Sequence, residues 1–293
     1  MSKKGALRAL PAWLSGVLVV GAFGVLVVLE RRRPLRRQTQ NQGRRDLRNL
    51  AIAGIAGASV GLAQKPVIGP LARLVERRRW GLVNLVGLPE PARTLLAVVL
   101  MDYTLYFWHW LTHKNPFLWR FHQAHHADLD LSATTATRFH FGEMLLSVPW
   151  RAAQVLVIGV SPRALSIWQT ATTVQILFHH ANLRLPVRFE RWLARIVVTP
   201  RMHGIHHSIV KRETDSNWST IFSVFDRLHG TMRLNVPQDQ ITIGVPAYRD
   251  ERDLTFANTL ALPFRRRLFG WIRPGQPFPD RGRLTLPVTT LAT

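Results

Sequence analysis

Residues 94–126 read TLLAVVLMDYTLYFWHWLTHKNPFLWRFHQAHH, and this stretch decides the fold class. Its first nineteen residues are uncharged apart from Asp102 and His109, so they predict a helix that can cross a bilayer, which takes about 20 residues. Four polar residues recur along it at i, i+4, i+7 and i+11, namely Asp102, Tyr106, His109 and His113. That spacing places them on one helix face. Such a face either marks function or is a polar stripe that a neighbouring helix satisfies.

The twelve histidines are gathered in one part of the chain. None occurs in residues 1–108, eleven lie between His109 and His207, and His229 is the twelfth. Cysteine is absent, which excludes disulfides, thiolate zinc fingers, iron–sulfur clusters and thiolate-ligated haem. Any bound metal therefore takes His, Asp or Glu as its ligands.

The charge balance is strongly basic, because 39 Lys and Arg residues face 17 Asp and Glu residues, a formal net charge of +22. Such a balance is typical either of nucleic-acid binding or of the cytoplasmic loops of a membrane protein. A run of 21 uncharged residues between Arg8 and Glu30 favours the membrane. Arginines follow this run instead of a small-residue cleavage site, so we expect a retained helix rather than a signal peptide.

Three further uncharged or nearly uncharged stretches are candidate spans, at residues 49–64, 144–162 and 164–183. The first is short and rich in Gly and Ala, which predicts a tightly packed helix or a re-entrant segment. The other two are joined only by Ser161-Pro162-Arg163 and predict a helical hairpin. The predicted fold class is therefore all-α, an integral membrane bundle of four or five transmembrane helices with a cytosolic helical cap rich in histidine.

The arginines predict the orientation in the membrane. Residues 30–48 carry eight of them, so this loop should stay in the cytoplasm. Five crossings then place the N-terminus outside and all clustered histidines on the cytoplasmic face, whereas four crossings reverse the N-terminus. The preference for Arg over Lys suggests a bacterial source and hence the bacterial inner membrane.

The predicted organisation has three parts. Residues 1–93 form an N-terminal transmembrane region, residues 94–232 form a catalytic region, and residues 233–293 form a basic tail. From Pro263 onward this tail mixes Arg with Phe, Trp and Pro, which is typical of a segment at a lipid interface.

Two H-x-x-H-H motifs carry the chemical prediction. They are FHQAHHA, with His122, His125 and His126, and MHGIHHS, with His203, His206 and His207. Imidazoles spaced at i, i+3 and i+4 share a helix face, and neutral imidazole is a good ligand for iron, zinc or copper. Eight or more histidines exceed what one ion can hold, so two ions are expected. Carboxylates are few nearby, which predicts a histidine-rich dinuclear site.

These motifs resemble those of the fatty acid hydroxylase / sterol desaturase superfamily, which comprises integral membrane, non-haem di-iron oxygenases. The resemblance covers roughly residues 98–232 and rests on D-x-x-x-Y-x-x-H-x-x-x-H, LWRFHQAHHA and H-x-x-H-H. TRFHFGE, FHHANLRLP and DSNWSTIFSVFDRLHGT resemble further family elements. The chain departs from those elements with Phe141 for Pro, Trp218-Ser219 for Tyr-Gly, Phe225 for Trp and His229 for Phe. None of these changes removes a histidine of the three motifs.

Carried over residue by residue, the resemblance implies eight catalytic metal ligands: His109, His113, His122, His125, His126, His203, His206 and His207. It implies His180, which precedes Ala-Asn, as a ninth. His179 is a further candidate, although only one of two adjacent histidines on a helix can point inward. His140 is expected as a ligand, behind the ligands, or bound to Glu143. His229 is not expected to bind metal.

Other side chains are expected just behind the ligands: Asp102, Tyr106, His140, Asp215 and Asp226. Carboxylates in that position commonly accept an N–H from a ligand imidazole. For the three aspartates, an ordinary ion pair with arginine is the alternative.

The resemblance implies an O2-dependent oxidoreductase that hydroxylates or desaturates an unactivated C–H bond of a lipid, whether fatty acyl, sterol or ether lipid, taken from the bilayer. It implies two iron ions and electrons from an external NAD(P)H-linked donor, a ferredoxin or cytochrome with its reductase. The alternatives are a zinc-dependent membrane hydrolase, which needs a Glu beside the ligands as in H-E-x-x-H, and a non-catalytic metal-binding or transport protein. Nucleic acid is not an expected partner, and the sequence leaves the oligomeric state open.

Overall fold

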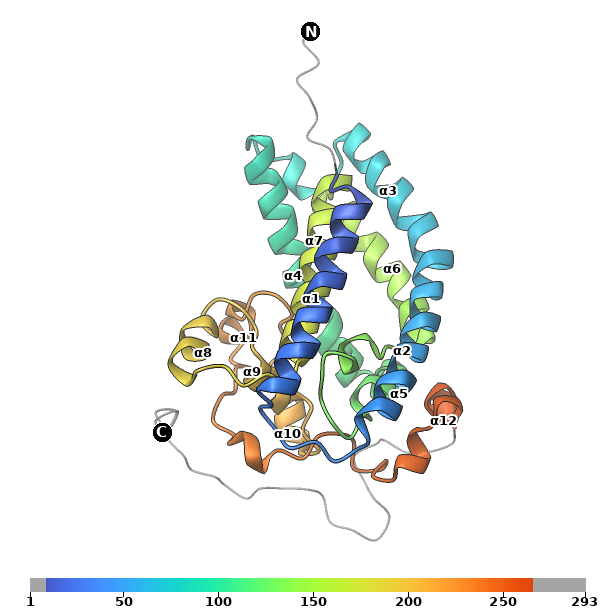
Figure 1. The fold of residues 1–293 in the computed structure, drawn as a ribbon. Coiled ribbons are helices and arrows are strands. Elements are labelled where there is room, and N and C mark those ends of the chain that lie inside the picture. Colours follow the sequence, from blue (N-terminus) through green and yellow to red (C-terminus); the bar gives the residue numbers. More distant parts are fainter. Residues whose placement is uncertain (1–8, 266–293) are drawn as a thin grey trace.

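A computed structural model describes residues 9–265, and within them the fold is all-α, with only isolated β-bridges. Long helical segments run up and down in alternation (Figure 1). They are α1 (Ala12–Arg32), α2 (Gln42–Ser59) continued by η1 (Val60–Gln64) and α3 (Lys65–Arg78), α4 (Glu90–Lys114), α6 (Phe141–Ile158) and α7 (Pro162–His180). The predicted division at residues 93 and 232 stays a prediction, and the predicted interfacial tail lies outside the described residues from position 266 onward.

Short helices form a cap at one end of these long segments (Figure 1). They are α5 (Pro116–His126), α8 (Val187–Leu193), α9 (Pro200–His206), α10 (Lys211–Thr214), α11 (Val224–Leu228) and α12 (Phe256–Ala261). Single 3-10 turns connect the helices: η2 (Leu82–Asn84), η3 (Thr135–Thr137), η4 (Gln238–Gln240), η5 (Glu251–Leu254) and η6 (Leu262–Phe264). The predicted hairpin is confirmed, because α6 and α7 are separated by three residues only.

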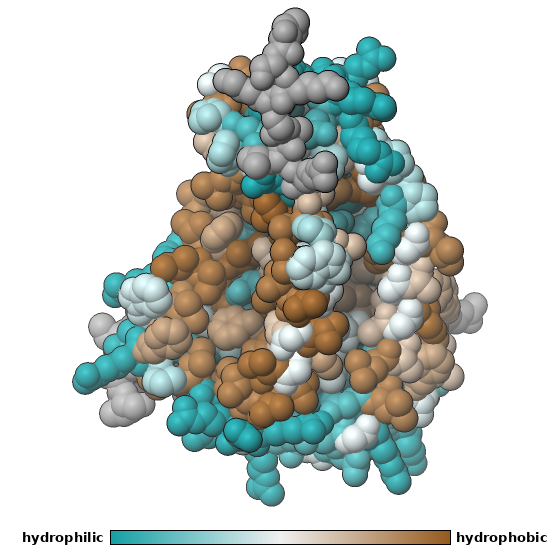
Figure 2. Space-filling model, turned by 45° about the horizontal axis from the view of Figure 1, so that its top comes forward, coloured by the Kyte–Doolittle hydropathy of each residue, from teal (hydrophilic) through white to brown (hydrophobic). Residues whose placement is uncertain are grey.

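Three segments among the described residues are long and apolar enough to cross a membrane, namely Ala12–Arg32, Gln42–Asn84 and Phe141–Ile158. On the face that Figure 2 shows, apolar side chains cover the middle of the molecule and hydrophilic side chains gather towards its two ends. This surface is that of an integral membrane protein, because lipid tails favour an apolar belt and water favours polar ends.

The second apolar stretch is longer than the sequence predicted. Residues 49–64 are helical, as one of the two alternatives predicted, but the helix is longer than this stretch, since it continues through a π-helical turn into α3 and ends at Arg78. The uncharged run stops at Lys65, but a helix needs only one apolar face to pack. Ile68, Ala72 and Val75 supply that face and are buried in the main core.

The main core joins α3, α4, α6 and α7. Its buried members include Ile68, Met101, Val155 and Trp168. At the end of the bundle away from the cap, the connection after α3 passes so close to the α6 C-terminus that Gly81, at φ 90°, has no room for a Cβ against the backbone of residue 159. Close packing of this kind fixes the positions of α4 and α7 along the bundle axis, and both helices carry histidines at their cap ends.

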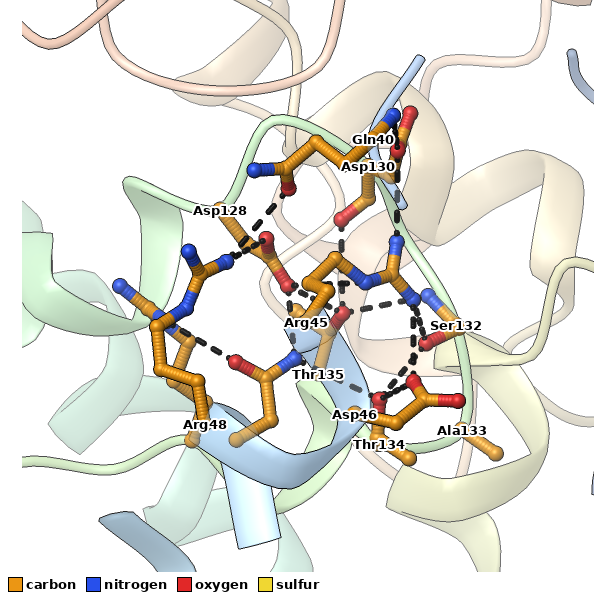
Figure 3. Close-up of polar contacts among 12 residues, drawn as sticks. Gln40, Arg45, Asp46, Arg48, Asp128, Asp130, Ser132, Ala133, Thr134 and Thr135 are labelled. Carbon is orange, nitrogen blue, oxygen red and sulfur yellow. Dashed lines mark hydrogen bonds and ion pairs between the residues drawn. The ribbon is translucent and has the colours of Figure 1, made fainter. Parts of the chain in front are cut away.

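A buried network ties the start of α2 to the loop after α5 (Figure 3). We call it the arginine–aspartate cluster and define it by Arg45, Arg48, Asp128 and Asp130. Asp128 accepts from Arg48 at 3.3 Å and lies 3.9 Å from the Arg45 Nε, while Arg45 Nη1 lies 3.6 Å from Asp130. Burial alone raises the pKa of the Asp128 carboxyl, but Arg45, Arg138 and Arg48 together hold that pKa below its usual value. The cluster thus fixes the loop that directly follows His125 and His126.

Candidate metal centre

The histidines form two adjacent ligand groups, which together we call the histidine centre. The first group contains His109, His113, His122, His126 and His206; the second contains His125, His180, His203 and His207. In each group one nitrogen from every ring lies within 4.8 Å of the others, and eight of the nine residues are buried. The rings come from the cap ends of α4 and α7 and from the short helices α5 and α9.

Each H-x-x-H-H motif is divided between the two groups. His122 and His126 of α5 join the first group while His125 joins the second. In the second motif the division is the reverse. His206 joins the first group, whereas His203 and His207, which directly follows α9, join the second. The motif therefore serves a two-part site, in which each short helix lies between both groups and links them.

Backbone carbonyls fix the tautomers of three rings. The Nδ1 of His109 lies 2.8 Å from the Trp218 carbonyl, and the Nδ1 of His206 lies 2.8 Å from the Ser216 carbonyl. His180 makes the same contact with the carbonyl of residue 176 at 2.8 Å. A carbonyl only accepts, so each Nδ1 carries the proton and each Nε2 keeps its lone pair for another partner.

Glu143 plays the corresponding part for a fourth ring. Its Oε1 lies 3.0 Å from the Nδ1 of His122, and both side chains are buried. A carboxylate that accepts this N–H makes the imidazole a stronger ligand through its other nitrogen. The Nε2 of His122 has no hydrogen-bond partner, so it is available to a metal.

The remaining nitrogens show that the residues present fit a metal pair. The Nε2 atoms of His125 and His203 each lie 3.0 Å from the Nε2 of His180, and those of His203 and His207 lie 3.1 Å apart. Nitrogens bound to one ion at about 2.0–2.1 Å lie about this far apart. Several other ring nitrogens of the centre are buried without a hydrogen-bond partner, including both of His113 and of His126. Burying polar atoms unpaired is costly, and a cation between the rings removes that cost.

The electrostatics of the centre agree with this fit. Burial first, and then the neighbouring imidazoles, hold the pKa of five rings well below the usual 6.5: His125, His126, His203, His206 and His207. Neutral imidazole is the form that binds a metal. The centre is thus ready for metal at neutral pH without first losing protons.

Two predicted candidates stand apart from both groups. The ring of His179 lies beside that of His203, with centroids 4.0 Å apart, but His179 belongs to neither group, so of the adjacent pair only His180 does. His140 caps α6: its Nδ1 accepts from the Gly142 N–H at 3.0 Å, and its Nε2 lies 3.0 Å from the carbonyl of residue 260. Both nitrogens of His140 are therefore engaged away from the centre.

The aspartates expected behind the ligands bind backbone or lysine instead of imidazole. Asp102 accepts from the N–H groups of Ile221 and Phe222 at 3.2 and 2.9 Å, and Asp226 accepts from those of Trp218 and residue 219 at 2.8 and 3.0 Å. Both carboxylates thus hold the segment that presents the Trp218 carbonyl to His109. They support the ligand through the backbone rather than by direct contact.

Two further predicted residues also lie outside direct contact with the ligands. Tyr106 reaches Thr231 at 3.0 Å between hydroxyl oxygens, and Thr231 in turn donates to Asp226 at 2.7 Å. Asp215 lies at the surface and accepts from Lys114 at 2.6 Å and Lys211 at 2.7 Å, so it forms an ion pair with lysine rather than with arginine. His229, not expected to bind metal, stacks on Tyr106 outside both groups.

Sequence reasoning missed the partners that orient the rings. The sequence predicts Glu143 only as a partner for His140, and the TRFHFGE motif is the signal that singles this carboxylate out. The carbonyls of residues 176, 216 and 218 carry no side-chain signal at all. They become visible only when the backbone is folded around the histidines.

Comparisons with known proteins point in one direction. Residues 94–231 match the family model described as fatty acid hydroxylase. The chain is 32% identical over 181 residues to the ornithine lipid hydroxylase of Rhizobium tropici, covering 61% of this chain and 52% of that protein. It is 26% identical to the alkylglycerol monooxygenase of Xenopus tropicalis, covering 52% and 33%, and 24% identical to the cholesterol 25-hydroxylase of Mus musculus, covering 48% and 47%. The chain thus spans a third to about half of the length of these relatives. No solved structure matches it significantly.

Proposed function

We propose that the protein is a membrane-bound di-iron oxygenase that hydroxylates a lipid, because residues 94–231 match the fatty acid hydroxylase family model. One observation carries the proposal: two adjacent groups are made only of histidine, and five of their nine rings line a cavity in the apolar helix bundle. Hydroxylation is favoured over desaturation because the names of the three relatives describe hydroxylases or a monooxygenase.

The overall reaction consumes the C–H substrate, O2, two electrons and two protons, and it yields the alcohol and one water. Iron bound at the centre supplies the redox chemistry with O2 that side chains lack. The nine grouped imidazoles would hold it, with His109, His180 and His206 fixed by backbone carbonyls and His122 fixed by Glu143. The bundle around the cavity limits the access of water to the reacting carbon.

The metal separates this proposal from its alternatives. We expect about two irons per chain in the active protein, as the two ligand groups require. One zinc per chain would support a zinc-dependent hydrolase, and here Glu143, the carboxylate nearest the ligands, is engaged by His122. A metal lost on mild dialysis would support a transport or storage protein.

The decisive experiment follows oxygen into a lipid. Purified protein loaded with Fe(II) is given bacterial lipid extract, NADPH, ferredoxin, ferredoxin reductase and 18O2, and the products are read by mass spectrometry. A lipid that gains one 18O atom is the expected result, and the His125→Ala protein should give none, since His125 belongs to the second group. Labelled product from the His125→Ala protein, or a metal-free wild type with full activity, would overturn the proposal.

We further propose five membrane crossings, by α1, α2–α3, α4, α6 and α7, with the histidine centre at the cytoplasmic face of a bacterial inner membrane. The arginines between α1 and α2 support this orientation. Because the chain has no cysteine, single cysteines report the side of the membrane. In intact cells an impermeant maleimide should label Gly87→Cys and spare Gln240→Cys; the reverse pattern would contradict the orientation.

The electron carrier is proposed to be an acidic ferredoxin or cytochrome linked to NAD(P)H. Four exposed arginines lie on and around α8: Arg184, Arg188, Arg191 and Arg195. A basic surface at the cap end attracts an acidic partner, and salt weakens that attraction. Reductase-coupled turnover should fall as salt rises, while turnover with a small chemical reductant should not. Equal salt dependence in both assays would exclude electrostatic docking.

A further inference from the structure

A cavity of about 360 Å³ connects the histidine centre with a second group of polar side chains inside the bundle. At the histidine end it is lined by His109, His122 and Glu143, among others. Arg151 also lines it, eight residues farther along α6 than Glu143, which is about 12 Å along the helix axis. The cavity is thus long enough to hold an extended hydrocarbon segment between two chemically different ends.

Arg151 is held rigidly by its neighbours on three helices. Its Nη1 donates to the Gln154 Oε1 at 2.6 Å, and the Gln154 amide donates in turn to Thr104 at 2.5 Å and to the Met101 carbonyl at 3.3 Å, both on α4. The guanidinium also lies over the Trp168 ring of α7, 4.1 Å from its centroid. The arginine is therefore oriented before any ligand arrives, which reduces the entropy lost on binding.

The charge of Arg151 has no counter-charge in the described part of the chain. The residue is 9% exposed, and no described carboxylate forms an ion pair with it. Among the described residues that line the cavity, Glu143 is the only carboxylate, and it is engaged by His122 at the opposite end. A guanidinium has five N–H donors, and the bond from Nη1 to the Gln154 Oε1 engages one of them. Buried charges are normally paired, so this one points to a ligand.

The surroundings of Arg151 offer further groups to such a ligand. The Trp168 Nε1 and the Thr172 Oγ1 are buried without a hydrogen-bond partner, and both residues line the cavity. Lys65 lines the same cavity from the α3 side and is exposed to the surroundings. A guanidinium beside an unpartnered indole N–H and a hydroxyl, at one end of an apolar cavity, is complementary to an anionic oxygen group. Ionisable groups within membrane helices are costly and mark function.

We propose that Arg151, with the Trp168 indole and the Thr172 hydroxyl, binds the anionic oxygen group, a carboxylate or phosphate, of a single-chain lipid whose hydrocarbon segment extends to the histidine centre. This inference rests on the proposed function, since it names the substrate class of that same site. The separation along α6 then places the reacting carbon in the middle of the chain, well away from the carbon next to the anionic group. Arg151 is a binding residue that sets which lipid enters and where it reacts.

Binding measured without turnover tests the inference. Displacement of tritiated palmitic acid from the full-length protein in detergent is followed with palmitic acid, hexadecyl phosphate and methyl palmitate. We expect the acid or the phosphate to bind about tenfold or more tightly than the neutral ester. A carboxylate source and a phosphate source are distinguished by which of the two anionic probes binds better. Equal binding of all three probes would overturn the proposal without the need for any variant.

Matched variants assign the preference to Arg151. Arg151→Gln should lose the preference for the anion and still bind methyl palmitate as the wild type does, while Arg151→Lys should keep part of it. Arg163→Gln is the control, because Arg163 lies 3.8 Å from Glu90 and outside the cavity. Anion preference that persists in Arg151→Gln would overturn the assignment. Retained binding of the ester shows that the variant is folded.

The outcome for this inference is separable from that for the proposed function. Labelled oxygen in a lipid together with equal binding of the acid and the ester would refute only the anion site. Selective binding of the acid with no oxidised product would refute only the oxygenase.

Discussion

The histidine centre and the arginine–aspartate cluster share the loop that follows α5, yet they satisfy their buried polar atoms in opposite ways. In the cluster, all four carboxylate oxygens of Asp128 and Asp130 accept hydrogen bonds, from Arg48, Asn49, Thr135, Thr39 and Gln40. In the histidine centre, many ring nitrogens have no hydrogen-bond partner, and others lie about 3.0 Å from the Nε2 of a second imidazole.

The difference separates scaffold from ligand site. In the cluster, opposite charges lie against each other, every carboxylate oxygen accepts a hydrogen bond, and only the Nε atoms of Arg45 and Arg48 lack one, so the cluster holds the backbone in place. Like groups that converge without a partner are complete only when something binds between them. Burial and polarity are common to both regions, so only the pairing of atoms distinguishes them.

Removal of one imidazole should have the largest effect. His206→Ala or His203→Ala each removes a ligand from one group, so we expect metal content to fall from about two ions to about one and hydroxylation to fall by about a thousandfold. Metal analysis and the 18O assay measure this. His229→Ala is the control, since that ring lies outside both groups. Full metal content in either ligand variant would show that the unpartnered rings do not bind metal.

Removal of one carboxylate from the cluster should destabilise the fold and spare the metal. Asp128→Asn leaves Arg45 and Arg48 without this counter-charge, and breaking a buried ion pair costs about 3–5 kcal/mol. The free energy of unfolding of the metal-free protein measures the loss, with the exposed Asp239→Asn as control. Metal bound per folded chain should stay the same. Lost metal at unchanged stability would place the cluster in the metal centre instead.

Much of this comparison was accessible from the sequence. The H-x-x-H-H spacing identified the histidines, since helical geometry brings i, i+3 and i+4 together whatever the rest of the fold. The division of each motif between two groups was not predictable, because it depends on how α5 and α9 lie against each other. Long apolar runs located the helices, but the run that ended at Lys65 underestimated α2–α3, whose second half is apolar on one face only.

Long-range polar partners were beyond the sequence for a different reason. Asp128 pairs with residues about eighty positions away, and no local pattern encodes such a distance. The same holds for Asp102, which accepts from backbone N–H groups about 120 positions away near His109 instead of touching a ring. Side-chain type predicts that a carboxylate needs donors, but only the fold decides which donors it meets.

A smaller effect is expected for Glu143, where a carboxylate pairs with a ring of the histidine centre. Glu143→Gln keeps the shape and weakens the acceptor for the His122 N–H, so metal affinity of the first group should fall by about 10–100-fold. Competition with a chelator of known affinity measures this change, and Glu76→Gln, on the exposed face of α3, is the control. If affinity is unchanged, His122 gains nothing from the carboxylate, and the first group depends on its backbone contacts alone.

The smallest effect is the contribution of Asp128 to the pH dependence of stability, and it separates the two regions by their titration. The pKa of buried rings such as His126 lies well below 6.5, so the unfolded chain takes up these protons first and the metal-free protein loses stability as pH falls below 6.5. The pKa of Asp128 lies below 3.8, so its contribution is present above pH 3.8 and is lost only as pH falls further. Unfolding followed from pH 7 to pH 3 should therefore show two losses in wild type, and Asp128→Asn should reduce the second while it leaves the first. If Asp128→Asn also removed the loss near pH 6, the two regions would titrate as one unit, and the division into scaffold and ligand site would fail.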